Sequence, residues 1–306
     1  MTARTAVARS SRPCRKAPET ESSPKARTAL LRAGDKVRNA NWFGLNCRIL
    51  LLLAAHLLSC GLRAQAPPPN GVLELDGKGS FVELPAGMFD DLPAATVEAW
   101  VRFESFVEDS RVFDFGIESR QMYLSHYGRT PRLKYLLADP DNRRNRIEVE
   151  ELWPLKRWCH VACVSGPGGL KLYFNGRLVL ANPYEGSFSG AAKDWRCRLG
   201  IRNESAAARA TAGFHGQIDE FRAWNVARTE DQIRENLAAR LKGNEPGLVG
   251  LWNFDDPALP GKDASPGAHH GTLMGAAKLA AAELPAAATL DHPGILSGRV
   301  VDPQGQ

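Results

Sequence analysis

The chain has 306 residues, with 39 Lys and Arg against 34 Asp and Glu, so its formal net charge at pH 7 is +5. Taken as a whole, this charge favours a nucleic acid or an anionic membrane as partner. Its distribution argues against both, because residues 1–48 carry eleven basic and three acidic side chains, whereas residues 67–306 carry 27 basic and 31 acidic ones. We therefore expect no nucleic-acid partner. The 28 Gly and 20 Pro favour many turns over a helical bundle.

The first 66 residues are predicted to be a leader. Residues 1–41 are basic and lack an apolar period, which is typical of a disordered segment or of a start codon assigned too far upstream. Residues 42–66 have the form of a signal peptide, because a basic flank precedes about ten apolar residues, too few to span a bilayer. We expect a secreted or cell-surface protein. As an alternative, residues 57–60 resemble the lipobox of bacterial lipoproteins, which places a lipid anchor on Cys60.

Three cysteines remain beyond the leader. Cys159 and Cys163 lie four residues apart on a predicted strand, so their Cα atoms are about 13 Å apart. A disulfide needs these atoms within about 7 Å. Cys197 is left able to pair with either of them, and the absence of a CxxC pair excludes a zinc ribbon.

The chain beyond Val72 is a succession of short predicted strands separated by turn residues. In residues 96–104 apolar and polar residues alternate, which places Val97, Ala99, Val101 and Phe103 on one face. Asn175-Gly176 is a strong hairpin signal, because both residues tolerate positive φ. Regularly spaced short strands predict a β-sandwich or barrel. The following strands are expected at Arg111–Gly116, Gln121–Tyr127, Arg132–Ala138, Arg146–Glu150, Trp158–Val164, Leu170–Phe174 and Arg177–Ala181.

One short helix is predicted after the last of the long strands. Thr229 to Gln232 has the form of a capping box. Ile233, Leu237 and Leu241 follow every four residues and form one apolar stripe. We expect this helix to pack on the edge of the sandwich.

Five motifs follow one another over about 154 residues. They are Val72–Gly77 with Phe81–Pro85, Thr96–Val101, Trp158–Ala162, Leu172–Gly176 and Gly216–Asn225. In this order they resemble laminin-G-like jelly-roll domains of exported bacterial proteins, which are part of the concanavalin A-like lectin/glucanase superfamily, and the W-x-H-V-A hairpin is shared with pentraxins. The resemblance implies an all-β concanavalin A-like jelly-roll β-sandwich with one short edge helix, over residues 67–245.

The C-terminal residues resemble further segments of such proteins. Residues 246–290 either add a strand that closes the sandwich or are the orphan start of a second copy, and we favour the closing strand because it buries Leu248, Leu251 and Phe254. Residues 291–306 resemble the truncated start of a carboxypeptidase-regulatory-like β-domain. We expect the chain to be part of a larger multidomain protein.

A structural Ca²⁺ is implied by the resemblance. It places Asp219, the aspartate of the Ile-Asp-Glu strand, at the ion, with backbone carbonyls near Asp76 and Gly77. Ca²⁺ takes six to eight oxygen ligands, so one or two carboxylates with carbonyls and water suffice. The alternative is that Asp219 accepts backbone hydrogen bonds and no metal binds.

Tyrosines on predicted strands and loops are candidates for sugar binding. Tyr123, Tyr127 and Tyr135 carry rings on which the C–H faces of sugars stack. Core packing explains any one of them equally well. The charged turn at residues 139–146 is an alternative site, for an acidic glycan.

Two carboxylates on one predicted strand raise the question of glycoside hydrolysis. Glu148 and Glu150 point to the same face. Glucanases of the resembled superfamily carry E-x-D-x-E or E-x-D-x-x-E, and no stretch here has that form. We therefore expect a non-catalytic extracellular module that binds carbohydrate or matrix, with a structural protein–protein adhesion module as the alternative and a glycoside hydrolase last.

Overall fold

The described part of the protein forms one β-sandwich. The leader, the predicted signal peptide and the Cys60 motif lie outside the described residues. Within the described ranges, no helix is long and apolar enough to cross a membrane. The structure is a computed structural model that describes residues 70–90, 92–117, 120–139, 141, 143–187, 196–203, 213–286 and 298–301, all within the compact unit Pro67–Gln306.

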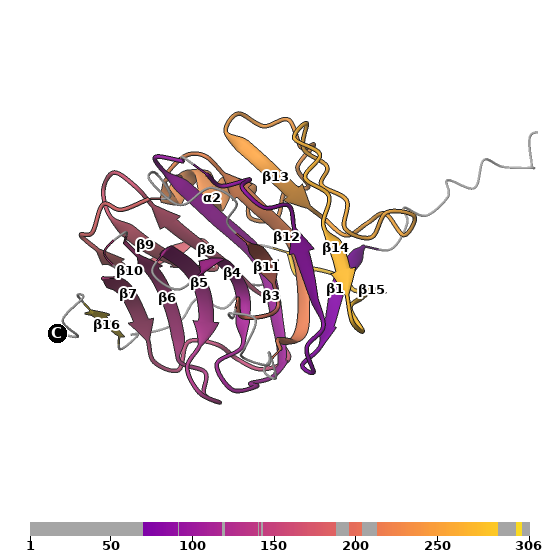
Figure 1. Ribbon diagram of the computed structural model, residues 1–306, viewed down its shortest axis with the longest axis horizontal. Helices are drawn as coiled ribbons and strands as arrows, with labels where there is room; N and C mark the ends of the chain where they lie inside the picture. Colours follow the sequence, from indigo (N-terminus) through magenta and orange to yellow (C-terminus); the bar gives the residue numbers. More distant parts are fainter. Residues whose placement is uncertain are drawn as a thin grey trace, which may run out of the picture. The chain divides into compact units, whose positions relative to one another are not determined.

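Two antiparallel sheets, each of eight described strands, make up the sandwich (Figure 1). Sheet A has the order β10-β9-β8-β3-β12-β1-β15, and β13 also pairs with β12. Sheet B has the order β14-β2-β11-β4-β5-β6-β7-β16. The predicted all-β jelly-roll fold is confirmed. The strands are β1 (Gly71–Asp76), β2 (Phe81–Leu84), β3 (Ala95–Ser105), β4 (Arg111–Ile117), β5 (Arg120–His126), β6 (Leu133–Ala138), β7 (Arg144–Val149), β8 (Cys159–Ser165), β9 (Leu170–Phe174), β10 (Arg177–Asn182), β11 (Cys197–Leu199), β12 (His215–Trp224), β13 (Leu248–Trp252), β14 (Thr272–Met274), β15 (Lys278–Ala281) and β16 (Gly298–Val301).

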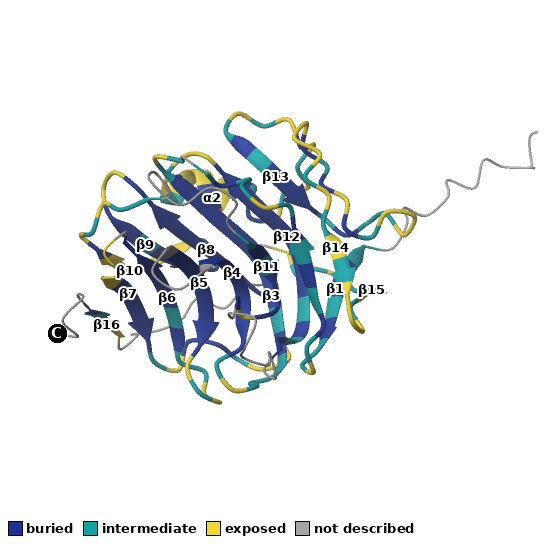
Figure 2. Ribbon diagram, viewed as in Figure 1, coloured by how far each residue is buried: buried dark blue, intermediate teal, exposed yellow. Residues whose placement is uncertain are grey.

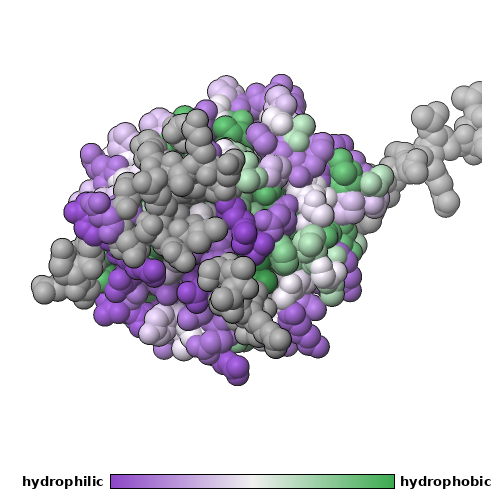
Figure 3. All heavy atoms as spheres, in the orientation of Figure 1, coloured by the Kyte–Doolittle hydropathy of each residue, from purple (hydrophilic) through white to green (hydrophobic). Residues whose placement is uncertain are grey.

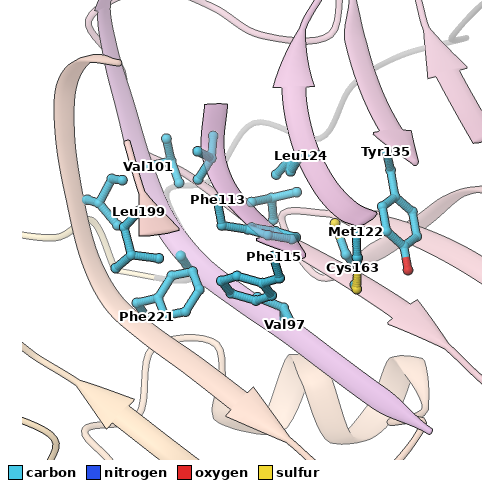
Figure 4. Packing of buried hydrophobic residues seen from close by; sticks show 14 of the residues in the cluster. Val97, Val101, Phe113, Phe115, Met122, Leu124, Tyr135, Cys163, Leu199 and Phe221 are labelled. Carbon is cyan, nitrogen blue, oxygen red and sulfur yellow. The ribbon is translucent and has the colours of Figure 1, made fainter. Parts of the chain in front are cut away.

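The core lies between the two sheets and is built from every second residue of each strand. All four apolar residues of the alternating pattern in β3 face it. Figure 4 shows Phe113 and Phe115 of β4 packed beside Phe221 of β12. Fully burying such a side chain contributes about 1.5–3 kcal/mol to folding. Figure 2 shows the result, with buried strands at the centre of the sandwich and exposed residues mainly in loops, and the surface in Figure 3 is mostly hydrophilic with small hydrophobic groups.

The segment after the helix supplies strands to both sheets. β13 pairs with the C-terminal half of β12, while β1 pairs with its N-terminal half. β14 forms one edge of sheet B and β15 one edge of sheet A. Trp252 of β13 is fully buried in the core. Residues 248–281 are thus part of the sandwich, and β16 pairs with β7 at the other edge of sheet B.

Helix α2 (Glu230–Asn236) packs on the outer face of sheet A and is shorter than the predicted stripe. Thr229 caps it through both hydrogen bonds of the capping box. The helix ends before Leu241, and buried side chains of the sheet bond the carbonyls at and just after its C-terminus. Arg222 donates to the carbonyls of Asn236 and Ala239 at 2.7 Å each, and the indole of Trp100 donates to that of Leu237 at 3.0 Å.

A buried polar network fills the space between α2 and sheet A. One carboxylate oxygen of Glu98 accepts a hydrogen bond from Arg228 at 2.7 Å and another from the Trp224 indole at 3.0 Å. Arg222 lies 3.7 Å from the same oxygen and donates twice to Glu220. His160 is fully buried 3.9 Å from Glu98. The two arginines and two glutamates balance in charge.

The three cysteines beyond the leader are buried thiols in the described structure. Cys159 and Cys163 lie on the same strand, β8, as the spacing argument required. The pairing of Cys197 with one of them, left open by the sequence, is not formed. Burial raises the pKa of the Cys163 thiol well above its ordinary value, so this side chain is an unreactive packing group.

Candidate ligand-binding face

The outer face of sheet B carries a continuous row of polar side chains. Ser125, Lys134, Glu148 and Arg299 are direct neighbours across β5, β6, β7 and β16, because antiparallel partners share a face. A second row of side chains runs beside the first one and includes Tyr123 of β5 and Arg146 of β7. We call this surface the tyrosine–cation face and define it by Arg111, Tyr123, Tyr127, Arg132, Lys134, Arg146, Glu148 and Arg299.

Two of the three predicted tyrosines belong to this face. Tyr127 is 48% exposed, whereas Tyr123 is only 3% exposed and lies under the guanidinium of Arg111, whose Cζ is 3.9 Å from the ring centroid. The ammonium of Lys134 is 5.5 Å from the centroid of Tyr123 and 5.1 Å from that of Tyr127. Arg132 lies 4.9 Å above the Tyr127 ring. The exposed ring is thus available for stacking and is framed by two cations.

Tyr135 is a core residue, so its predicted role in ligand binding is wrong. It lies opposite Leu124 in the register of β5 and β6, and both side chains point into the sandwich (Figure 4). Its hydroxyl donates to the carbonyl of Val164 at 3.1 Å and the residue is fully buried. The side chain therefore cannot contact a ligand on the outer face.

Lys134 is the least compensated charge of the face. Its side chain is half-buried, and its ammonium makes no ion pair or hydrogen bond among the described residues. Burial, with the nearby charge of Arg111, lowers the pKa of Lys134 to about 8. The group still carries most of its positive charge at pH 7.

Glu148 and Glu150 are held by arginines. Glu148 forms ion pairs with Arg132, Arg146 and Arg299, and Arg132 also reaches Glu150 at 3.0 Å. Although burial alone would raise the pKa of Glu148, its hydrogen bond to Arg299 and the charge of Arg132 bring it below the ordinary value. A general acid needs the opposite shift, so Glu148 is unsuited to that role.

The sequence-predicted metal residues lie apart. Asp76 is opposite His215 in the register of β1 and β12, four residues from Asp219, which is about 13 Å along a strand. The Asp76 carboxylate accepts hydrogen bonds from Lys78 and Ser80, and the Gly77 amide donates to Phe214. Grouping Asp76 and Gly77 with Asp219 was therefore wrong, because the antiparallel register sets Asp219 beside the start of β1 instead.

Asp219 is fully buried next to the beginning of β1. It accepts hydrogen bonds from the Asn70 amide at 2.7 Å and from the backbone of Glu220 at 2.7 Å. Asp255 accepts from the Gly71 backbone at 2.9 Å, and Arg240 bonds both Asp255 and Asn70. Burial, with the charges of Glu220 and Asp255, raises the pKa of Asp219 to about 8.

Two hollows open on the outer side of sheet A. One of about 460 Å³ lies beside the Asp219 cluster and is lined by Asn70, Arg222 and Arg240 among others. The other, of about 430 Å³, lies at the far end of β12 and includes Asp76 and His215. In the part of the chain that the structure describes, no group of three His, Cys, Asp or Glu side chains is placed to hold a metal.

Residues 76–234 match the model of a laminin-G-type family described as the concanavalin A-like lectin/glucanases superfamily, which is more than half of the 306 residues. The chain belongs to this superfamily. Mouse (Mus musculus) pappalysin-1 is 26% identical over 207 residues, 62% of this chain and 12% of pappalysin-1. Human (Homo sapiens) pappalysin-1 is 23% identical over 194 residues, 58% of this chain and 12% of its own length. The chain therefore spans about an eighth of the curated relatives it matches.

Two solved structures are similar to this chain to different degrees. A proposed carbohydrate-binding protein from Bacteroides ovatus superposes with a TM-score of 0.55 and 20% identity, covering 72% of this chain and 61% of that one. A heptameric pentraxin from Limulus polyphemus matches with a TM-score of 0.45 and 14% identity, over 72% of this chain and 98% of that one. At 20% identity, the likeness to the Bacteroides ovatus protein shows a shared fold alone.

The sequence patterns described above did not predict the cations of the tyrosine–cation face. The sequence does carry a signal for one of them, Lys134. In β6 the residues Leu133, Tyr135 and Leu137 alternate with Lys134, which predicts that the lysine points away from the core. The same pattern assigns Tyr135 to the core. The approach of Arg132 and Arg299 to Glu148 has no local signal, because it depends on the register of three strands.

Proposed function

We propose that this chain is a non-catalytic, extracellular carbohydrate-binding module that holds its ligand on the tyrosine–cation face. The observation that carries the proposal is the exposed ring of Tyr127, framed by the cations of Arg132 and Lys134. A stacking surface beside hydrogen-bond donors is the arrangement with which proteins bind sugars. The carbohydrate-binding description of the Bacteroides ovatus protein, which shares the fold, agrees with this function.

Tyr127→Ala is expected to abolish binding on a glycan array, because it removes the exposed stacking surface. Tyr127→Phe is expected to keep most of the binding, since the ring remains. Leu178→Ala is a matched control, because Leu178 is 45% exposed on β10 of sheet A. Equal binding by Tyr127→Ala and the control would move the site away from this face. A blank array for the unaltered protein would favour the adhesion module instead.

We further propose that a structural Ca²⁺ binds at Asp219, with other ligands than the sequence indicated. The donors fit in part, since the carboxylates of Asp219 and Asp255 and the amide oxygen of Asn70 lie in one hydrogen-bonded cluster. Backbone carbonyls and water would complete the coordination. Bound there, the ion would neutralise a buried carboxylate. Arg240 supplies the positive charge of this cluster in the structure, so Ca²⁺ has to displace it.

Ca²⁺ is expected to raise the melting temperature in calorimetry relative to EGTA, because an ion that binds only the folded state stabilises it, by about 2.7 kcal/mol at 100 times Kd. Asp219→Asn should remove this response, and Arg240→Gln should enlarge it by freeing two ligands. Asp76→Asn is the control and should respond like the unaltered protein. If Ca²⁺ leaves the melting temperature unchanged in both the unaltered protein and Arg240→Gln, the calcium site at Asp219 is rejected.

A further inference from the structure

The tyrosine–cation face has more positive than negative charge around its exposed ring. Arg132, Lys134, Arg146 and Arg299 stand against one buried carboxylate, Glu148, and against Glu150 at the rim. The chain beyond residue 66 carries the opposite sign, with 27 basic and 31 acidic side chains. The cations are therefore concentrated on this face by the fold.

The arginines and the lysine of this cluster differ in how far their charges are compensated. Arg132, Arg146 and Arg299 all donate to Glu148. Lys134 is the direct cross-strand neighbour of Glu148, yet it forms no ion pair in the described structure and faces two tyrosine rings instead. A half-buried ammonium without a direct ion pair has lost hydration, and the more distant charges of Asp109 and Glu148 offset only part of that loss. An anionic group on the ligand would restore that loss.

We propose that the ligand is an anionic glycan, with a carboxylate or sulfate group seated at Lys134 and Arg132 and a sugar ring on Tyr127. This inference rests on the proposed carbohydrate-binding function. A neutral sugar offers only hydroxyls to the ammonium, whereas a charged oxygen forms a shorter and about twice as strong a hydrogen bond. Arg132 lies over the same tyrosine ring as Lys134, so one acidic group can approach both cations while the ring stacks.

The nearest carboxylates do not take the place of such a ligand. Glu148 already accepts from three arginines, and Glu150 is held by Arg132. Asp109, whose charge also acts on Lys134, accepts from the Gly128 backbone at 2.8 Å and forms no ion pair with the lysine in the described structure. On the other side of the row, Arg111 pairs with Asp114 at 3.3 Å and stacks on Tyr123. Lys134 therefore lies between two sets of paired charges, the arginines around Glu148 and the Arg111–Asp114 pair.

The test compares heparin and polygalacturonate with dextran and xylan in titration calorimetry, using the full chain. We expect the anionic polymers to bind more tightly, with affinity falling as salt rises. Lys134→Met should weaken anionic binding about tenfold or more, the worth of one charge-assisted hydrogen bond, and should weaken binding of neutral polymers clearly less. Lys134→Arg should retain part of the anionic binding that Lys134→Met loses. The control is Lys278→Met, which removes an exposed lysine paired with Glu74 at the edge of sheet A.

Each result has a distinct meaning. Neutral polymers bound as tightly as anionic ones would overturn the anionic class and keep the proposed function. No binding of any of the four would overturn the proposed function and this inference with it. Anionic binding weakened equally by Lys134→Met and Lys278→Met would mean diffuse attraction, and the site at Lys134 would be rejected. Matching circular dichroism and melting temperatures show that the variants are folded.

Discussion

Glu98→Gln is expected to lower the free energy of unfolding by about 3–5 kcal/mol, because it leaves buried arginines without their carboxylate. Glu98 accepts from Arg228 at 2.7 Å and from Trp224 at 3.0 Å, and Arg222 lies 3.7 Å away. None of these groups reaches water to replace the lost charge, since all four side chains are almost fully buried. Urea unfolding at pH 7 measures the loss.

Glu104→Gln provides the matched control on the same strand. Glu104 pairs with Arg102 at 3.4 Å and Lys156 at 3.5 Å, but its side chain is 36% exposed, so we expect a loss of at most about 1 kcal/mol. A double-mutant cycle of Glu98→Gln with Arg228→Met should show a coupling energy of about 0.5–3 kcal/mol. Equal losses for Glu98→Gln and Glu104→Gln would mean that the network is solvated.

Asp114→Asn is expected to change how stability depends on pH. Burial, opposed by Arg111 and Gln121, raises the pKa of Asp114 to about 6 in the folded protein. Because this lies above the ordinary value of 3.8, the contribution of Asp114 is fully present below pH 4 and is lost as pH rises through about 6. Between pH 4 and 7 the unaltered protein should lose about 2 kcal/mol relative to Asp114→Asn.

The measurement is urea unfolding of both proteins at pH 4, 5.5 and 7, and the informative quantity is the difference between them at each pH. Asp114→Asn also loses the contact with Arg111, which changes the difference in unfolding free energy by a constant amount. The informative result is therefore how this difference varies with pH, not its size at any one pH. Asp256→Asn is the control, because hydrogen bonds from Lys262 and the backbone lower the pKa of Asp256 and give its contribution the opposite sign. A difference that stays constant from pH 4 to 7 would contradict a protonated Asp114.

Local sequence patterns predict most of the strands. The contacts between distant strands depend on their register, which local patterns do not predict. The alternation in residues 96–104 assigns the buried face of β3 correctly, because a strand exposes each side every second residue. The capping box at Thr229 predicts where α2 begins. The contacts at its end could not be predicted, since they depend on Arg222 and Trp100 of sheet A reaching the carbonyls there.

The candidate site was less predictable because it combines strands that are distant in sequence. Of the three tyrosines predicted to bind a ligand, Tyr127 is exposed on the outer face, Tyr123 is buried under Arg111, and Tyr135 lies on the core side of its strand. A calcium ligand at Asp219 stays a prediction. Its neighbours could not be predicted from the sequence, because they depend on the register between β1 and β12. The charges of Glu98 and Arg222 resemble a solvated strand face until α2 is known to cover them.

The family match ends at residue 234, whereas the sandwich does not. β13, β14 and β15 follow that residue, and β14 and β15 cover the open sides of β2 and β1. A chain cut at the family boundary would expose three rows of unpaired backbone donors and acceptors, on β1, β2 and the C-terminal half of β12, and would remove Trp252 from the core. Such edges join other chains, so a shortened protein should aggregate. The smallest expressible unit is therefore expected to extend at least from Asn70 to Ala282, whose amide donates back to the Asn70 carbonyl.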